Sequence, residues 1–257
     1  YLALGIRSFR LNDLPSGRIG TVHFRIRYSG STQREAIFMS VEVETIDCAA
    51  LTEAQLEDMV AMGGSFDMER LLKAKEDWVL CTTSIEAGKV QGFTFSTLER
   101  IGGTPCVLLG LMSVKRSSKR DQILKGLMAE AFHRALMAFP DEDVVVGSRF
   151  LNAEGLEAFK QLTELIPRPG HRAVGEERAW GRRLARRFGV DATYDEKTFI
   201  VAKKGLSGFL DHESTKADKI KPEIAELFAG VNPAVGGCLI IHGWTMTEDL
   251  LKLGKLK

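Results

Sequence analysis

Two different periodicities of apolar residues meet in one central unit of this chain, at residues 106–136. Residues 106–114 form an almost continuous apolar run after the turn residues 102–105, which is typical of a strand buried on both faces. A basic, serine-containing turn follows at 115–120. Apolar residues then recur every three or four positions, as on one helix face: Ile123, Leu124, Leu127, Met128, Ala131 and Ala135. The pattern predicts a strand, a basic turn and a long helix.

The segments before this unit predict a pair of helices and an antiparallel meander. Residues 41–47 alternate between apolar and polar, as in a half-exposed strand, whereas 52–62 and 68–75 have the capped pattern of short helices. Strands are predicted at 78–84 and 90–98. Because tight turns separate these two strands and the central one, all three are expected to pair antiparallel.

The segments after the unit continue the alternation of strands and helices. We expect a strand at 144–150, a helix at 153–162 and a strand at 198–203. A short apolar strand at 238–242 and a final helix at 248–253, capped by Thr247, are predicted near the end of the sequence.

The composition allows one sizeable core and gives no sign of a nucleic-acid or membrane partner. The 257 residues are 44% hydrophobic and 27% charged, and the net charge of +1 indicates no global attraction to nucleic acid or membranes. No apolar run reaches membrane-spanning length. The four cysteines are widely spaced and form no CxxC pair, which favours buried reduced thiols in a cytoplasmic protein and argues against a metal site.

Residues 1–38 differ from the remainder of the chain. They contain six arginines and no lysine, with Asp13 and Glu35 as the only acids. We predict that this segment is a leader outside the core fold and that the folded domain begins near Met39. The arginine-rich, acid-poor composition also fits an organellar transit peptide, which we rank lower.

The junction between the central strand and its helix predicts an anion site. The first turn of a helix presents free backbone N–H groups and a partial positive charge, which together favour phosphate. Ser117 or Ser118 is expected to cap this helix. The cations around the turn are Lys115, Arg116, Lys119, Arg120 and Lys125. A solvated basic turn without any ligand is the alternative.

From residue 78 to residue 159, the chain resembles a divergent member of the GNAT superfamily of acyl-CoA N-acyltransferases. The order of meander, long helix, strand and helix carries the resemblance. The family's acyl-CoA loop reads Val, four residues, Arg or Gln, two residues, Gly, one residue, then Gly or Ala. Val114 and Lys119 take the first two positions here, whereas Gln122 and Leu124 replace the small residues. Side chains at those positions restrict how closely a pyrophosphate approaches the backbone.

The resemblance implies a three-layer α/β/α fold with a mixed, mostly antiparallel central sheet. The predicted parts are the leader at 1–38, a GNAT-like acyltransferase domain at 39–204 and a C-terminal α/β extension at 205–257. The sequence leaves open whether the extension adds a strand to the sheet edge, covers the acceptor groove or forms a homodimer interface.

The resemblance also implies a cofactor site at the strand–helix junction and at the end of the later strand. No metal is implied. The expected acyl-CoA contacts are Met112, Ser113, Val114, Lys119, Arg120, Asp121, Gln122, Ile123, Leu124, Lys125 and Asn152. Asn152 is equally well explained as a helix cap. Where the family usually has a tyrosine that protonates the leaving thiolate, this chain has Phe159, which we expect to pack in the core.

The implied reaction is acyl transfer from acetyl-CoA or another acyl-CoA to an amine that the sequence does not identify. No catalytic residue is assigned, because Glu86, Glu99 and His133 are all better explained as solvated or structural groups. The first alternative is a GNAT-like binding module without catalysis. The second is an RNA-associated protein that uses the arginines of a basic helix at 178–187, although a solvated face docked by Trp180 and Leu184 is the simpler interpretation.

Overall fold

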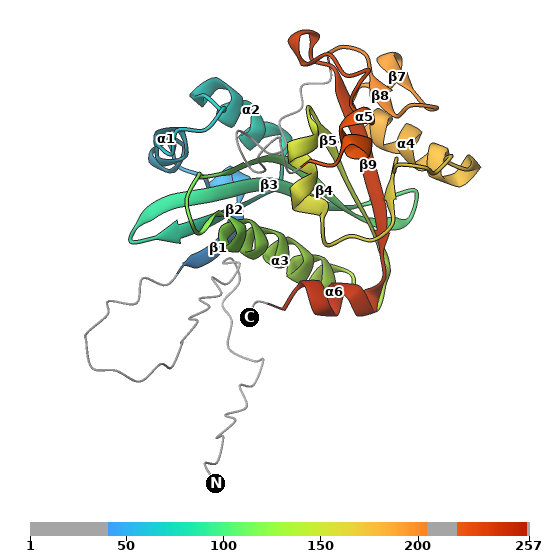
Figure 1. The fold of residues 1–257 in the computed structure, drawn as a ribbon. Coiled ribbons are helices and arrows are strands. Elements are labelled where there is room, and N and C mark those ends of the chain that lie inside the picture. The colour runs from blue at the N-terminus through green and yellow to red at the C-terminus, as the bar shows by residue number, and fades with distance from the viewer. Residues whose placement is uncertain (1–40, 205–219, 256–257) are drawn as a thin grey trace.

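The computed structural model describes residues 41–204 and 220–255, and these form one sheet with helices on both faces (Figure 1). The predicted leader lies outside the described residues. Along the sheet the strands follow the order β1, β2, β3, β4, β5, β9, β8 and β7, and β6 pairs with β9. The strands are β1 (Glu42–Asp47), β2 (Leu80–Glu86), β3 (Lys89–Ile101), β4 (Thr104–Val114), β5 (Val144–Phe150), β6 (Leu165–Ile166), β7 (Tyr194–Asp195), β8 (Ile200–Val201) and β9 (Cys238–Thr245).

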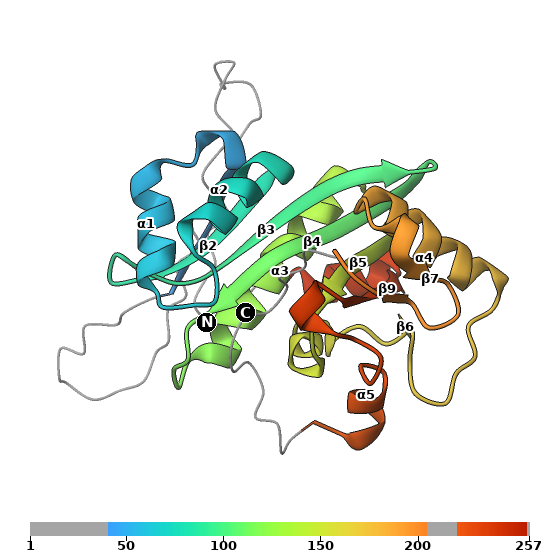
Figure 2. The same cartoon turned by 90° about the horizontal axis from the view of Figure 1, so that it is seen from above.

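Two layers of helices enclose the sheet (Figures 1 and 2). Its pairs are antiparallel except β4 with β5, which is parallel. The predicted three-layer α/β/α fold with a mixed, mostly antiparallel sheet is therefore confirmed. The α-helices are α1 (Glu53–Ala61), α2 (Met68–Asp77), α3 (Arg120–Ala138), α4 (Gly175–Arg187), α5 (Pro222–Glu226) and α6 (Thr247–Leu253).

The side chains of β4 show why each face is covered. Val107 and Leu109 belong to the core formed with α3, whereas Cys106 and Leu108 belong to the core that contains residues of α1, α2 and α4. Successive side chains of a strand point to opposite faces, so a continuous apolar run buries both. The prediction of a doubly buried central strand is confirmed.

Local chemistry at the chain's turns matches the sequence pattern. Thr52 and Gln55 form the reciprocal capping box of α1, and Asp67 caps α2 by accepting a hydrogen bond from the Arg70 amide (2.9 Å). The β2–β3 hairpin turns at Ala87 and Gly88, whose φ angles are +50° and +71°. These are the positive values that a tight hairpin turn requires.

The segment after β5 differs from the prediction. An α-helix through residue 162 was expected, but the chain forms a 3₁₀-helix, η2 (Ala153–Phe159). Gly155 lies against the Phe150 ring, so close that an added Cβ would stand 2.8 Å from Cδ1. Phe159 packs edge-on against the same ring at 5.1 Å between centroids. Contacts with β5 thus draw this short segment onto the sheet and override its weak helical pattern.

The C-terminal residues complete the interior of the sheet. β9 lies between β5 and β8, so the strand predicted at 238–242 enters the sheet rather than adding to its edge. The predicted Thr247 cap is wrong, because the N-cap of α6 is Met246 and makes no side-chain cap. Thr247 instead donates from its amide and its hydroxyl to Asp143 Oδ1, at 2.9 and 3.3 Å.

Candidate functional site

The two parallel strands at the centre of the sheet separate after a short paired base. Cys106, Val107 and Leu108 of β4 pair with residues 145–147 of β5, and the parallel register ends there. The Ser148 hydroxyl donates to the Leu109 carbonyl at 2.7 Å. Both strands continue beyond this point without further pairing to each other in the described ladders. The two strands thus part above their paired base and leave a gap between them.

A β-bulge lies in β4 where the separation begins. Thr94 of β3 pairs with Met112, and Ser96 pairs with Leu109, so Phe95 faces both Gly110 and Leu111. A bulge of this kind places two consecutive residues on the same face and bends the strand. The bulge was not predicted, although an isolated glycine within an apolar run is a recognised signal of one.

Trp78 explains why the bulge contains a glycine. A Cβ at Gly110 would stand 2.3 Å from Cε2 of the indole, and Trp78 is 8% exposed. The ring occupies the space that a side chain at position 110 would need. Gly110 therefore permits the close approach of Trp78, at the C-terminal end of α2, to the sheet.

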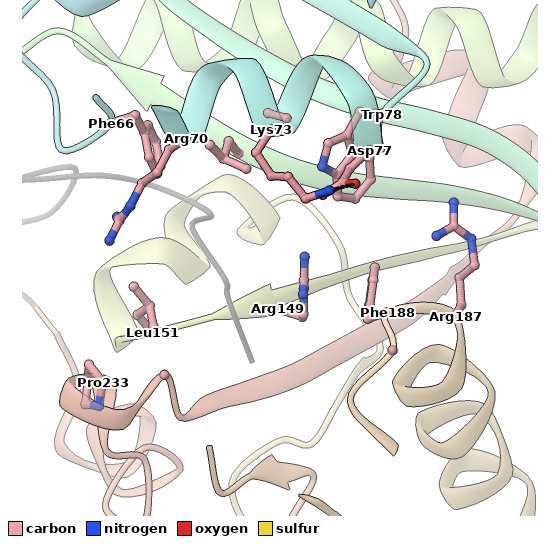
Figure 3. Close-up of a pocket in the computed structure, with 14 residues that line it drawn as sticks. Phe66, Arg70, Lys73, Asp77, Trp78, Arg149, Leu151, Arg187, Phe188 and Pro233 are labelled. Carbon is pink, nitrogen blue, oxygen red and sulfur yellow. Dashed lines mark hydrogen bonds and ion pairs between the residues drawn. The ribbon is translucent and has the colours of Figure 1, made fainter. Parts of the chain in front are cut away.

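A cavity of about 450 Å³ opens on this face, where α2, β4, β5 and the end of α4 meet (Figure 3). Phe66 and Trp78 form part of its apolar wall on the α2 side, Leu111 contributes from β4, and Leu151 contributes from the residue just after β5. The volume lies in the range of small-molecule sites. No sequence signal pointed to it, because its walls come from segments far apart in the chain.

Charged groups surround this cavity. Lys73 pairs with Asp77 at 2.9 Å, and Arg187 pairs with Glu99 at 2.5 Å. The Arg149 guanidinium lies 4.7 Å from the centroid of the Phe188 ring, a cation–π geometry. Burial lowers the pKa of Arg149, although an arginine stays protonated in proteins.

The opposite face carries the predicted anion site at the start of α3. Lys119 is the N-cap and makes no side-chain cap, so the predicted serine cap is wrong. Ser117 forms a turn just before the helix, accepting from the Lys119 amide on its hydroxyl and from the Arg120 amide on its carbonyl, both at 3.2 Å. Helical bonding starts with Ile123, whose amide donates to the Lys119 carbonyl at 3.0 Å.

The charged predicted residues at this helix start contact neighbouring acids. Lys119 pairs with Glu86 of the β2–β3 hairpin, and Arg120 pairs with Asp121 at 2.6 Å. A groove of about 140 Å³ runs between α3 and the segment around η2, and Asp121, Leu124 and Lys125 are among its lining residues.

The other predicted contacts divide into buried and exposed positions. Met112, Ser113 and Val114 are buried at the end of β4, and Ile123 and Leu124 are buried in α3, so a ligand would meet these residues mainly through the backbone. Gln122 and Lys125 are exposed. The Asn152 side chain accepts from the Gly155 amide at 3.3 Å, in the manner of a cap. Acyl-CoA contacts at all these positions stay predictions.

Phe159, Glu86, Glu99 and His133 each contact other parts of the chain. Phe159 is fully buried, which confirms the expected core position. Glu86 and Glu99 form the ion pairs with Lys119 and Arg187. The backbone of His133 lies against Gly254, at the end of α6.

The basic helix α4 docks as the simpler interpretation predicts. Trp180 and Leu184 are buried beneath it, with 2% and 0% exposure. Arg182 pairs with Glu196, and Arg183 stacks at 4.9 Å over the Trp180 ring. Several of its arginines thus interact with the chain itself.

Within the described residues, no group of three or more His, Cys, Asp or Glu side chains could hold a metal ion. The four cysteines are buried and form no disulfide, and burial raises the pKa of Cys106 to about 11. Among the helices of the described ranges, none is long and apolar enough to cross a membrane.

Comparisons with known proteins give only distant structural likenesses. No family model matches the sequence, and no curated protein matches it either. The chain is similar to the ribosomal-protein-S18-alanine N-acetyltransferase of Escherichia coli (10% identity, TM-score 0.36), over 52% of this chain and 86% of the other. It is also similar to an aminoglycoside acetyltransferase from an uncultured soil metagenomic sample (17%, TM-score 0.30), over 41% and 76%.

A third similar structure is a putative acetyltransferase from Pyrococcus horikoshii, at 13% identity and a TM-score of 0.34, over 87% of this chain and 95% of the other. TM-scores this low do not indicate a function, so any functional inference depends on the strand geometry of the chain itself.

Proposed function

We propose that this protein is a divergent GNAT-type N-acyltransferase that transfers an acyl group, most simply acetyl, from acyl-CoA to an amine. The observation that carries the proposal is the separation of β4 from β5 beyond the base at 106–108. A strand edge released from its neighbour can bind the pantetheine amides as it would bind an added strand. Met112, Ser113 and Val114 would supply that edge through their backbone.

The start of α3 would hold the phosphates of the cofactor. Its first N–H groups and the helix dipole favour an anion, and Lys119, Arg120 and Lys125 add positive charge nearby. Leu124 stands where the family has a small residue. Its side chain is buried in the core, so it would not obstruct a phosphate on the solvent side of the helix start. Gln122, which replaces the other small residue of the family's loop, is exposed.

The bulge would be the reaction centre. Its backbone can polarise the thioester carbonyl, and a neutral amine then attacks the carbonyl carbon. The new C–N bond forms as the C–S bond breaks, the amine loses a proton and the CoA thiolate gains one. Phe159 cannot supply that proton, so we assign no side chain as the acid.

Donor and acceptor would approach from opposite faces of the sheet. The groove beside α3 lies on one face, whereas the 450 Å³ cavity lies on the face of α2 and α4. The cavity is lined by Leu111 of β4 and Arg149 of β5, and the groove is lined by residues of α3 and of the segment around η2. This division would bring the amine to the thioester without competition from the nucleotide.

Calorimetric titration with acetyl-CoA tests the proposal. We expect one binding site, and Lys125→Gln should weaken it by roughly 2- to 5-fold, through loss of about 0.3–1 kcal/mol of interaction with the phosphates. The matched control is Lys197→Gln, which removes an exposed charge in the β7–β8 turn. Absence of binding by a folded protein would refute the proposal.

A binding module without catalysis is the second candidate, and the buried Phe159 favours it. The two candidates differ in thiol release. Acetyl-CoA binding followed by amine-dependent appearance of free CoA supports the enzyme, whereas binding without thiol release across a broad amine panel supports the module.

A further inference from the structure

The cavity beside the bulge has a rigid aromatic wall. Phe66 and Trp78 line it on the α2 side, and they are only 5% and 8% exposed. The Phe66 ring packs on Phe93 at 6.3 Å between centroids, and Phe93 packs edge-on against Phe95 at 5.9 Å. Trp78 lies against Gly110 of the bulge. Rings that the core already fixes in place offer apolar surface to a ligand at a low ordering cost.

The remaining apolar lining leaves room beside these rings. Arg70, Ala74 and Trp78 follow one another at intervals of four residues, which places them on one face of α2 and its C-cap. Ala74, the middle residue of the three, carries only a methyl group. Leu111 of the bulge and Leu151 just after β5 add aliphatic surface. The cavity of about 450 Å³ is therefore large enough to hold a ring-sized apolar group.

The cavity wall is unfavourable for a ligand with a second positive charge. Asp77 is the one acid among the described residues that line the cavity, and it pairs with Lys73 at 2.9 Å. A second ammonium group would therefore find no unpaired carboxylate among these described residues. Arg70 and Arg187 also belong to the lining, and their charges repel another cation. The lining thus disfavours diamines and polyamines.

Two arginines of the lining are engaged by the protein itself. Arg187 pairs with Glu99 at 2.5 Å. Arg149, on the floor of the cavity, rises from β5 toward α2 (Figure 3). It stacks on the Phe188 ring and has a further interaction within the chain. A ligand therefore gains mainly from the aromatic and aliphatic surface of this cavity, because apolar area removed from water needs no free polar partner.

Leu111 relates the cavity to the proposed reaction centre. It belongs to the bulge, where Phe95 faces both Gly110 and Leu111, and it also lines the cavity. A group bound in the cavity is thus next to the backbone that would polarise the thioester. An amine must be neutral to attack, and apolar surroundings disfavour its charged form. The same lining that binds an apolar body would therefore raise the fraction of reactive amine.

We propose that the acceptor is a monoamine with an apolar, ring-sized body, and that this body fills the cavity between the aromatic wall of α2 and Leu151. The inference rests on the proposed acyltransferase function, and it narrows the acceptor to hydrophobic amines such as arylalkylamines. Small polar amines are poor acceptors because they leave the apolar wall uncovered. Polyamines are poor acceptors because their second charge has no partner.

The test compares amines in two matched pairs. Free CoA is measured with acetyl-CoA and phenylethylamine or methoxyethylamine, and then with hexylamine or hexamethylenediamine. The ether oxygen lowers the pKa of its amine and leaves more of it neutral, and the diamine has two reacting groups, so both biases oppose the expected result. We expect phenylethylamine to exceed methoxyethylamine by roughly 10- to 100-fold in kcat/KM. Hexylamine should exceed the diamine by roughly 10-fold or more.

Variants assign these preferences to the cavity. Leu151→Asp places a carboxylate in the apolar wall, where it can pair with a second ammonium group, so the ratio of hexylamine to diamine should fall by roughly 10-fold or more. Leu151→Asn has nearly the same shape without the charge and should keep most of the ratio. Leu72→Asp is the second control, because Leu72 is 47% exposed on α2 outside the cavity lining, and its ratio should match that of the unmodified protein.

The outcomes separate this inference from the function beneath it. Acetyl-CoA titration of each variant verifies that the protein is folded and binds its donor. If acetyl-CoA binds but the members of each pair are used equally, or no apolar monoamine is used, the apolar-acceptor inference is wrong while donor binding stands. If Leu151→Asp binds acetyl-CoA and leaves the ratio unchanged, the body of the acceptor does not occupy this cavity and the inference is again wrong. Failure of acetyl-CoA to bind the unmodified protein removes the proposed function itself.

Discussion

The two ends of the β4–β5 pair show what the same strands do under different packing. At the base, Leu108 faces Gly147 in parallel register, and Leu184 of α4 closes over that glycine, 3.0 Å from where its Cβ would stand. At the far end the parallel register stops, β4 bulges at Gly110, and Arg149 of β5 lines the cavity. The base is a sealed core, whereas the far end lines a cavity.

The difference indicates that the gap between β4 and β5 depends on the paired and fully buried base beside it. Paired strands satisfy their backbone groups, and the apolar layers on both faces make the base rigid. Separation beyond the base exposes backbone and admits charge, both of which cost free energy without a partner. A site is therefore expected where the strands part, and stability where they pair.

The largest expected effect is a loss of stability when the packing at the paired base is disrupted. Leu108→Ala removes a fully buried side chain at the paired base and should lower the free energy of unfolding by about 2–5 kcal/mol. Denaturant unfolding measures the change. The matched control, Leu72→Ala on α2, truncates a leucine that is 47% exposed and should cost much less. Equal losses in both variants would contradict the distinction between base and surface.

A smaller loss of stability, with a sharper loss of function, is expected at the bulge. Gly110→Ala forces a Cβ against Trp78 and should cost roughly 1–3 kcal/mol while distorting the cavity and the bulge. Unfolding experiments and amine-dependent thiol release measure the two effects. Gly175→Ala is the control, since a Cβ there meets nothing within 4 Å. Full activity in Gly110→Ala would show that the bulge geometry is not needed.

The smallest effect is a pH dependence at the sealed end. His242 of β9 pairs with Gly147, its Nε2–H donates to the Glu177 carbonyl at 3.1 Å, and burial lowers its pKa to about 4. The unfolded chain, with the ordinary pKa near 6.5, binds a proton first as pH falls. The contribution of His242 to the free energy of unfolding is therefore present above pH 6.5 and is lost as the pH falls toward 4. The loss is about 1 kcal/mol at pH 5.5.

Thermal or denaturant unfolding between pH 8 and 5.5 checks this dependence against His242→Gln, which lacks the titrating group. The variant should lose about 1 kcal/mol less over that interval than the unmodified protein. Parallel curves for the two proteins would show that His242 does not contribute. Other groups titrate in both proteins, so only the difference between the curves is informative.

Much of the fold was predictable because the patterns were local. The capping box at Thr52 and Gln55, the hairpin turn at Ala87–Gly88 and the apolar run of β4 each express a preference of neighbouring residues. The failures occurred where distant contacts won. The segment after β5 packs on Phe150 and forms a 3₁₀-helix instead of an α-helix. The Thr247 hydroxyl donates a hydrogen bond to Asp143 instead of capping α6.

Of the proposed site, the sequence indicated only the part at the start of α3. Charge and helix periodicity marked the start of α3, because these features are continuous in sequence. The cavity joins Phe66 and Trp78 to Arg149 and Phe188, segments that pattern alone does not bring together. The sequence motif also left the role of Leu124 open, and its burial in α3 was needed to interpret it.

By itself the sequence determined the order of strands and helices, the doubly buried central strand and the basic turn after it, since each depends on the period of apolar residues and on local charge. Tertiary structure alone decided where β4 and β5 part, that β9 enters the sheet beside β5, and that Arg149 lies at the floor of a cavity. Strand register and cavity walls arise from packing between segments distant in the chain, and no local pattern encodes that distance.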